Sequence, residues 1–224
     1  RKTGIQVLTR DDEEVRIHPH YGVFSPVRSE YINLVLKAPL PEAIKQSSTA
    51  FDIGTGTGVL AVVLALRDIQ KIIATDLNDR AIECAQDNVD HLGLKAHIEI
   101  RKTNLFPEGK ATLIVCNPPW LPARPSSSLE HAVYDPESQM LKGFLHGLKN
   151  HLLPKGEGWL ILSDLAEHLG LRTREALLGW IADAGLQVLG RLDVKPVHGK
   201  TQDATDPLHA ARAAEVTSLW RLGV

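Results

Sequence analysis

The sequence predicts an open α/β sheet that is mainly parallel, with helices on both of its faces. Five short apolar runs alternate with helix-like segments, and two further strand-like runs follow towards the end of the chain. A glycine-rich turn joins the first run to an apolar helix, and polar side chains come directly after several runs. Such alternation is typical of parallel sheets, in which ligands bind at the carboxyl ends of the strands. We therefore expect a ligand site at that edge.

Composition indicates one globular domain with a full core. The chain has 224 residues, of which 43% are hydrophobic and 23% are charged. The formal net charge of −2 provides no general positive field that would gather nucleic acid. No apolar run approaches ~20 residues and no secretory signal is visible, so we expect no membrane contact.

Cysteine and histidine usage argues against a disulfide framework and a metal site. Cys84 and Cys116 lie in apolar patterns, which predicts buried thiols in a reducing compartment. The expectation of a cytoplasmic location rests on the absence of a visible targeting signal. The ten histidines are scattered, and none has the spacing of a metal ligand set. Nothing in these patterns indicates an oligomeric state.

The first part of the chain is predicted to differ from the rest. Residues 5–17 alternate weakly around an acidic stretch, which predicts a hairpin with an acidic tip. The chain begins with Arg1, and its only methionine is Met140, so we interpret it as a piece of a longer protein. Residues 1–28 are then a hairpin and lead-in segment, a remnant of or linker to a missing N-terminal region. Residues 29–224 form the main domain.

The elements of the main domain follow from hydrophobic periodicity and from end signals. Strands are predicted at 50–53, 71–76, 96–100, 113–116, 159–162, 186–194 and 216–222. Helices are predicted at 29–37, 59–66, 79–92, 141–152 and 173–184. Ser29 is a candidate N-cap, Gly93 and Gly185 are helix stops, and Pro154 and Gly156 end the fourth helix.

Two segments are predicted to be loops. Residues 121–136 are rich in proline and serine, which indicates a long loop or lid over the site. We expect His131 and Tyr134 to be surface residues of this loop; the alternative is that they touch the substrate. Residues 197–215 are polar and then alanine-rich, which predicts a loop with a short helix.

The glycine turn predicts a nucleotide site. Its pattern is D-x-G-x-G-x-G, running from Asp52 to Gly58, and the glycines allow close approach of a ligand to the backbone. It differs from the dinucleotide fingerprint G-x-G-x-x-G, because Val59 stands where the last glycine would be, and no Lys-Ser/Thr follows as in a phosphate-binding loop. Asp76, 18 residues beyond Gly58, ends the next strand. Its carboxylate could accept from both hydroxyls of a ribose; the alternative is an acid at a helix start.

The tetrapeptide Asn117-Pro118-Pro119-Trp120 follows the buried strand 113–116. Each proline fixes its own φ and favours an extended residue before it, so the Asn117 side-chain oxygen and the Pro118 carbonyl are held as two acceptors. Trp120 offers a flat face for stacking. This is a receptor for a planar group that carries an NH2; the alternative is a proline-rich turn that leaves a strand.

Together these motifs resemble those of the class I S-adenosylmethionine-dependent methyltransferases. The resemblance implies a Rossmann-like seven-stranded sheet, with S-adenosylmethionine as the cofactor. Motif I of that family corresponds to Asp52, Gly54, Thr55, Gly56 and Gly58, and the acid on the ribose to Asp76, with Leu77 beside it.

Within that superfamily the chain is similar to the small-domain, HemK/PrmC-like branch. Asn117-Pro118-Pro119-Trp120 resembles the N/D-P-P-Y/F/W motif of members that methylate amino nitrogens. Segment 21–30 is similar to one that covers the methionine end of the cofactor, which implies binding roles for Phe24 and Pro26. Asn104 stands where the branch has an acid that reads the adenine.

The resemblance implies N-methylation, with the acceptor left open. A glutamine side chain of a protein and an adenine or guanine amino group of RNA or DNA present the same NH2 geometry. The near-neutral net charge favours a protein acceptor, or an RNA bound through a missing N-terminal domain. The tryptophan favours a base and departs from the tyrosine usual in glutamine methylators. The rival hypothesis is a non-catalytic, Rossmann-like nucleotide-binding regulatory subunit.

Overall fold

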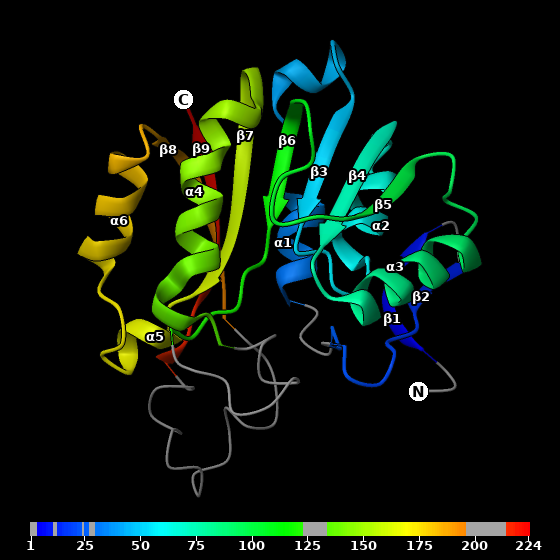
Figure 1. Ribbon diagram of the computed structural model, residues 1–224, viewed down its shortest axis with the longest axis horizontal. Coiled ribbons are helices and arrows are strands. Elements are labelled where there is room, and N and C mark those ends of the chain that lie inside the picture. The colour runs from blue at the N-terminus through cyan, green and yellow to red at the C-terminus, as the bar shows by residue number, and fades with distance from the viewer. Residues whose placement is uncertain (1–3, 11–12, 24, 27–29, 123–133, 196–213) are drawn as a thin grey trace, which may run out of the picture.

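The computed structural model describes residues 4–10, 13–23, 25–26, 30–122, 134–195 and 214–224 (Figure 1). A seven-stranded sheet has the order β5-β4-β3-β6-β7-β9-β8. Strands β3 to β7 run parallel, and β9 is antiparallel to both of its neighbours. The strands are β3 (Thr49–Ile53), β4 (Lys71–Asp76), β5 (Ile98–Lys102), β6 (Ala111–Cys116), β7 (Leu152–Ser163), β8 (Gln187–Val194) and β9 (Thr217–Gly223). The predicted mainly parallel sheet is confirmed.

Helices cover both faces of this sheet, and each face has its own core. The helices are α1 (Glu30–Lys37), α2 (Val59–Leu66), α3 (Asp79–His91), α4 (Gln139–His151), α5 (Leu165–His168) and α6 (Arg174–Asp183), with 3-10 turns η1 (Glu42–Lys45) and η3 (Pro136–Ser138). Helices α1 and α2 pack on one face of the sheet, and Val89 of α3 belongs to the same core. Helices α4 and α6 pack on the other face. No helix within the described ranges is long and apolar enough to cross a membrane.

The register of the parallel strands brings the predicted site residues to one level. Ile53 of β3 pairs with Thr75 of β4 on one side and with Cys116 of β6 on the other. The next residue of each strand is therefore Gly54, Asp76 or Asn117, and all three leave the sheet at the same edge. This edge lies at the bottom of the view in Figure 1.

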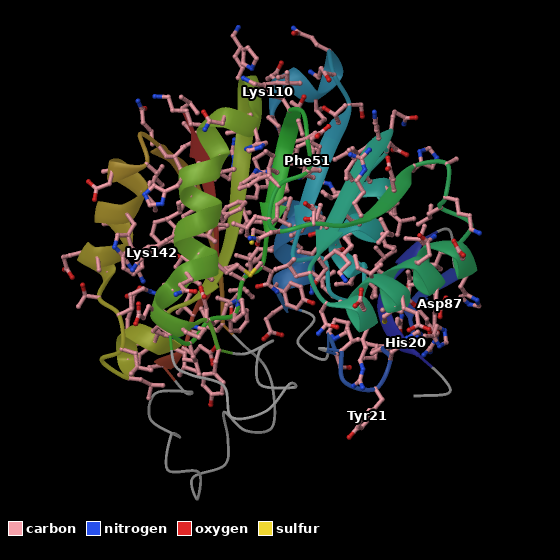
Figure 2. All side chains as sticks on the ribbon, viewed as in Figure 1. His20, Tyr21, Phe51, Asp87, Lys110 and Lys142 are labelled. Atoms are coloured by element: carbon pink, nitrogen blue, oxygen red, sulfur yellow. The ribbon has the colours of Figure 1, made fainter. Side chains whose placement is uncertain are left out.

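The N-terminal hairpin is confirmed by β1 (Ile5–Arg10) and β2 (Glu13–Ile17), which pair antiparallel. Asn88 of α3, which is 1% exposed, ties the segment after the hairpin to the glycine turn. Its side chain accepts from the backbone N–H of His18 at 2.8 Å and donates to the carbonyl of Thr57 at 3.0 Å. His20 Nε2 lies 3.1 Å from a carboxylate oxygen of Asp87, and both are labelled in Figure 2.

Strand β7 begins earlier than predicted, whereas the fourth helix ends within one residue of its predicted end. Helix α4 runs directly into β7 at Leu152, seven residues before the predicted strand start. Leu152 pairs with Ala111 and Glu157 with Leu113, so the residues between Leu152 and Glu157 form a bulge. A Cβ at Gly156 would stand 2.7 Å from the Thr112 carbonyl oxygen, so only glycine fits there. Pro154 and Gly156, expected to stop a helix, shape this bulge instead.

Two other predicted features change or lie outside the described residues. The third strand begins at Ile98, two residues late, because Leu94 accepts backbone bonds from His97 and Ile98 and closes a turn there. The loop with a short helix predicted at 197–215 lies almost wholly outside the described ranges, as does most of the predicted lid at 121–136.

An ion pair between a partly exposed arginine and a buried carboxylate links β7 to β9. Glu157 is 5% exposed and accepts from Arg221 Nε at 2.8 Å, from Arg221 Nη2 at 2.6 Å and from Trp159 Nε1 at 2.9 Å. Removal of one partner from such a pair leaves an uncompensated charge in the core, which costs more than the pair itself contributes.

We predict that Arg221→Met lowers the free energy of unfolding by about 3 kcal/mol, because the Glu157 carboxylate then stays buried without its partner. The double variant Glu157→Gln/Arg221→Met should recover more than half of that loss. Urea denaturation of the three proteins measures both effects. A loss of less than about 1 kcal/mol in Arg221→Met, the value typical of exposed pairs, would contradict this account.

Candidate active site

The glycine turn joins β3 to α2 in left-handed backbone conformations. Gly54, Gly56 and Gly58 have φ values of 70°, 56° and 82°, which side chains with a Cβ rarely adopt. A Cβ at Gly54 would overlap Met140 Cε, and one at Gly58 would lie 3.3 Å from Ala85 Cα of α3. At Gly56 no atom of the described residues lies within 4 Å of the Cβ position, so among these residues the middle of the turn is open to a ligand.

Asp52 holds this turn from behind. It is 1% exposed and accepts hydrogen bonds from Thr55 Oγ1 at 2.6 Å and from the backbone N–H of Ala61 at 3.0 Å. Burial raises the pKa of Asp52 to about 6, and the nearby charge of Asp76 adds to that rise, whereas the two hydrogen bonds oppose it. The structure therefore gives Asp52, like Gly58, a role in the frame of the site rather than in its lining.

Asp76 stands at the end of β4 and faces the same turn. One carboxylate oxygen accepts from the backbone N–H of Gly56 at 3.0 Å, and the other from that of Asn78 at 2.9 Å. Asn78 caps α3 by accepting from the backbone N–H of Arg80 at 2.9 Å. Both carboxylate oxygens of Asp76 keep lone pairs that a ribose diol could use.

A cavity of about 1030 Å³ opens between these strand ends. It is lined by Gly54, Thr55, Gly56, Asp76, Leu77, Asn104, Asn117, Pro118, Pro119 and Trp120 from the predicted set. Its size is sufficient for a nucleotide-sized ligand, since ligand pockets measure roughly 300–1,000 Å³. The two motifs thus share one cavity although they are far apart in sequence.

The segment after β5 supplies a further wall. Thr103, Asn104 and Leu105 line the cavity, and Leu105 has a φ of 58°. Thr75 Oγ1 donates to the Leu105 carbonyl at 2.6 Å, which holds this unusual backbone in place. Asn104 is exposed and has no charge, so any contact with an adenine would be a neutral hydrogen bond.

The proline motif leaves β6 with trans peptide bonds throughout. Asn117 is half-buried, and its side-chain oxygen accepts from Trp120 Nε1 at 2.9 Å. The sequence predicted this oxygen as an acceptor for a substrate only, so the internal donor is a new feature. A carboxamide oxygen has two lone pairs, so it can still accept one more hydrogen bond.

The opposite wall was missed by sequence reasoning. Tyr134, expected at the surface of the loop, lines the cavity beside Asp135 and forms an isolated β-bridge with Leu121. The Asp135 carboxylate is buried and accepts from the backbone N–H groups of Met140 and Leu141 at 2.9 and 3.0 Å. An acid shortly before a predicted helix is a capping signal, and that signal could have located this wall.

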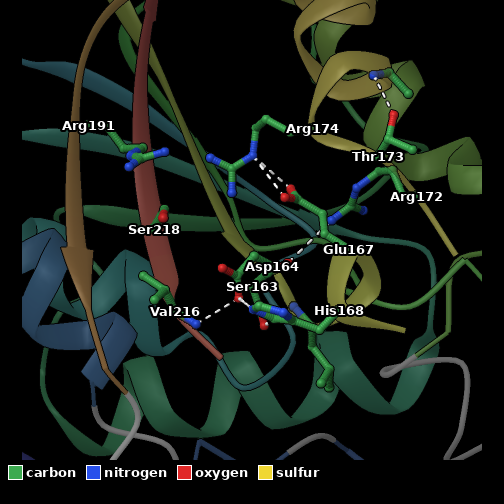
Figure 3. A network of polar contacts seen from close by, with 12 residues as sticks. Ser163, Asp164, Glu167, His168, Arg172, Thr173, Arg174, Arg191, Val216 and Ser218 are labelled. Carbon is green, nitrogen blue, oxygen red and sulfur yellow. Dashed lines mark hydrogen bonds and ion pairs between the residues drawn. The ribbon is translucent and has the colours of Figure 1, made fainter. Parts of the chain in front are cut away.

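Ser163 and Asp164, at the end of β7, belong to a network of polar contacts (Figure 3). Leu165, just beyond them, completes the lining of the cavity. Its backbone N–H donates to Ser163 Oγ at 3.0 Å. The backbone N–H of Val216 donates to Asp164 Oδ1 at 2.7 Å, which anchors the start of β9. Arg174 Nε donates to both oxygens of Glu167, at 2.9 and 3.0 Å.

The lead-in segment contributes only part of what the sequence predicted. Gly22 and Val23 line the cavity, whereas Pro26 is buried outside it and Phe24 lies beyond the described residues. Tyr31 of α1 lines the cavity and is 2% exposed. Burial raises the pKa of Tyr31 well above its ordinary value, so its phenol stays neutral.

The chain is similar to known methyltransferases in sequence. The family model described as methyltransferase small domain matches residues 14–173. The release factor glutamine methyltransferase of Cereibacter sphaeroides is 32% identical over 180 residues, which are 74% of this chain and 59% of that protein. The tRNA1(Val) (adenine(37)-N6)-methyltransferase of Shewanella halifaxensis is 30% identical over 150 residues, 61% of this chain and 57% of the relative.

Solved structures support the same fold. A methyltransferase from Pyrococcus furiosus superposes with a TM-score of 0.62 at 20% identity, covering 94% of this chain and 90% of that one. The ribosomal protein L11 methylase from Lactobacillus delbrueckii superposes with a TM-score of 0.60 at 20% identity, covering 97% and 89%. The predicted class I fold is thereby confirmed. The family match confirms the predicted resemblance to the small-domain branch. It also confirms that this family consists of methyltransferases, with S-adenosylmethionine as the predicted donor.

We predict that the buried carboxyl of Asp52 makes stability depend on pH. Its pKa is about 6 in the fold, against an ordinary value of 3.8. Between these values the folded chain keeps the proton that the unfolded chain has lost, so stability decreases as the pH rises through this window. A gap of about two units corresponds to about 3 kcal/mol.

Urea denaturation between about pH 4 and about pH 7 measures this dependence. Asp52→Asn, which keeps an acceptor for Thr55 Oγ1, should remove most of it. Asp183→Asn, on the exposed side of α6, is the matched control for the change in net charge. A pH dependence that is the same in wild type and Asp52→Asn would contradict the prediction.

Proposed function

Because the chain belongs to the methyltransferase small-domain family, we propose that it transfers a methyl group from S-adenosylmethionine to a planar amide or amino nitrogen. The observation that carries this proposal is the shared cavity. Asn117 and Pro118 lie on its wall together with the glycine turn and Asp76.

The donor side of the cavity fits the cofactor by its chemistry. The open position at Gly56 lets the cofactor lie against the backbone, and Asp76 offers carboxylate oxygens to the ribose. Thr103 and Asn104 supply neutral groups for the adenine ring. When bound there, S-adenosylmethionine supplies an electrophilic methyl group on a sulfonium.

On the acceptor side, the chain's task is to orient a poor nucleophile. The lone pair of an amide or exocyclic amino nitrogen is delocalised into its π system. The remaining lone pair of the Asn117 oxygen and the Pro118 carbonyl would each accept one N–H, which favours a pyramidal nitrogen with its lone pair towards the cavity. S-adenosylmethionine held by the glycine turn and Asp76 would supply its methyl group to the nitrogen that Asn117 and Pro118 orient, and the methylated nitrogen would then release its proton to water. No strong base is needed before transfer.

The acceptor belongs to a protein or a nucleic acid. One similar protein is named as a release factor glutamine methyltransferase and another as a tRNA adenine methyltransferase. Both names refer to a planar NH2 on a macromolecule, which supports the same class of acceptor here. The chain spans less than two thirds of the length of either relative. A cytoplasmic location stays a prediction.

Transfer of radiolabel from S-adenosylmethionine to a cell lysate tests the proposal. Label that is removed by protease identifies a protein acceptor, and label removed by RNase or DNase identifies a nucleic acid. Calorimetry with S-adenosylhomocysteine is run beside it. Binding without any transfer would support the rival non-catalytic subunit, and absence of both would remove the proposal.

We predict that Asn117→Ala lowers turnover about 100-fold, the typical cost of one oriented hydrogen-bonding group in a transition state. The affinity for S-adenosylhomocysteine should stay within about two-fold of wild type, since Asn117 acts on the acceptor. Asp76→Ala is the contrasting variant and should weaken that affinity about ten-fold or more, through loss of charged hydrogen bonds. The reverse pattern would overturn both assignments.

A further inference from the structure

We propose that Trp120 is a positioning residue, which fixes the orientation of the Asn117 amide through its indole N–H. The hydrogen bond from Trp120 Nε1 to Asn117 Oδ1 is 2.9 Å long and joins two half-buried side chains of the same motif. This role deepens the proposed function and rests on it for its catalytic meaning. It differs from the stacking role that the sequence predicted for the ring.

The hydrogen-bonding chemistry of the indole and the carboxamide favours one of the two amide orientations of Asn117. An indole nitrogen can only donate, whereas a carboxamide presents an acceptor oxygen on one side and a donor NH2 on the other. A flipped Asn117 would place its NH2 against the indole N–H, donor against donor. The bond therefore selects the orientation in which the oxygen lies beside Trp120 and keeps one lone pair for an acceptor N–H.

The indole is itself held firmly. Trp120 packs against the core clusters of both sheet faces, because it leaves β6 where the two layers meet. Pro118 and Pro119 restrict the backbone between the two partners, and Cys116 before them is fully buried. Because the Trp120 side chain and the backbone of the motif have few accessible conformations, the Asn117 amide is oriented before a substrate binds.

The proposed role requires an indole at this position, because the ring must carry an N–H donor that reaches Asn117. A phenyl ring has a comparable flat face and no donor, and the hydroxyl of a tyrosine lies at the far end of its ring. Trp120→Phe therefore removes the N–H and keeps an aromatic surface. Asn117→Asp has the complementary effect, because two equivalent oxygens make the orientation of the group irrelevant.

The first experiment measures the hydrogen bond without reference to activity. In the ¹⁵N–¹H spectrum of the labelled chain, the Trp120 indole resonance is assigned by its loss in Trp120→Phe. In Asn117→Ala we expect this resonance to shift and its N–H to exchange with solvent at least about ten-fold faster, because its acceptor is gone. The indole resonances of Trp159, Trp180 and Trp220 are internal controls. An unchanged Trp120 indole would overturn the proposal.

The second experiment is a double-mutant cycle on kcat. Trp120→Phe should lower kcat about ten-fold in the wild-type background and less than about two-fold when combined with Asn117→Asp, with little change in the affinity for S-adenosylhomocysteine. Equal losses in both backgrounds would show a role in packing or stacking only, and would overturn the proposal.

A matched tryptophan controls for general effects of the substitution. Trp180 lies on α6, where Lys142 Nζ stands 4.5 Å from the centre of its ring, and it does not line the cavity. Trp180→Phe should leave kcat within about two-fold. If wild type transfers no methyl group to any acceptor, the proposed function fails, and the indole spectrum still decides whether Trp120 orients Asn117.

Discussion

The parallel register of β3 with its two neighbours is the constraint on which the site depends. Ile53 lies level with Thr75 and with Cys116, so the chain leaves the sheet at Gly54, Asp76 and Asn117 in one row. A shift of either neighbour by one residue would turn its terminal side chain to the opposite face of the sheet. The two buried cores, one on each face, make such a shift costly, and the stability of the layers thereby supports the geometry of the cavity.

The half of the site that we propose for the methyl donor is a glycine turn held by two carboxylates. Asp52 reaches the turn from the core and Asp76 reaches it from the next strand, and each accepts from a group in the turn or in the helix after it. Burial of the Asp52 carboxyl opposes folding at neutral pH, as its raised pKa shows. The Asp52 carboxylate offsets part of this cost by accepting hydrogen bonds from the turn and from α2, which an apolar side chain could not do.

The acceptor half is built from rigid parts of a different kind. Pro118 and Pro119 limit the backbone, and Trp120 spans the junction of the two cores while its indole reaches back to Asn117. Facing them, the Asp135 carboxylate fixes the start of α4 and so places Met140 beside Gly54. Asn117 and Asp135 thus each have a partner within the protein and also line the cavity, as the proposed orienting role of this half requires.

The sequence by itself determined the local features of this protein. Apolar periodicity predicted the strands and most of the helices, the D-x-G-x-G-x-G turn predicted a nucleotide site, and Asn117 with its prolines predicted an acceptor site. Only the tertiary structure decided the contacts between distant residues. It turned Pro154 and Gly156 into a bulge of β7, placed Asp52 behind the turn, moved Tyr134 from the expected surface to the wall of the cavity, and gave the Asn117 oxygen an indole donor. Periodicity reports which face of an element is buried, whereas the partner of a polar side chain depends on packing between elements that are far apart in the chain.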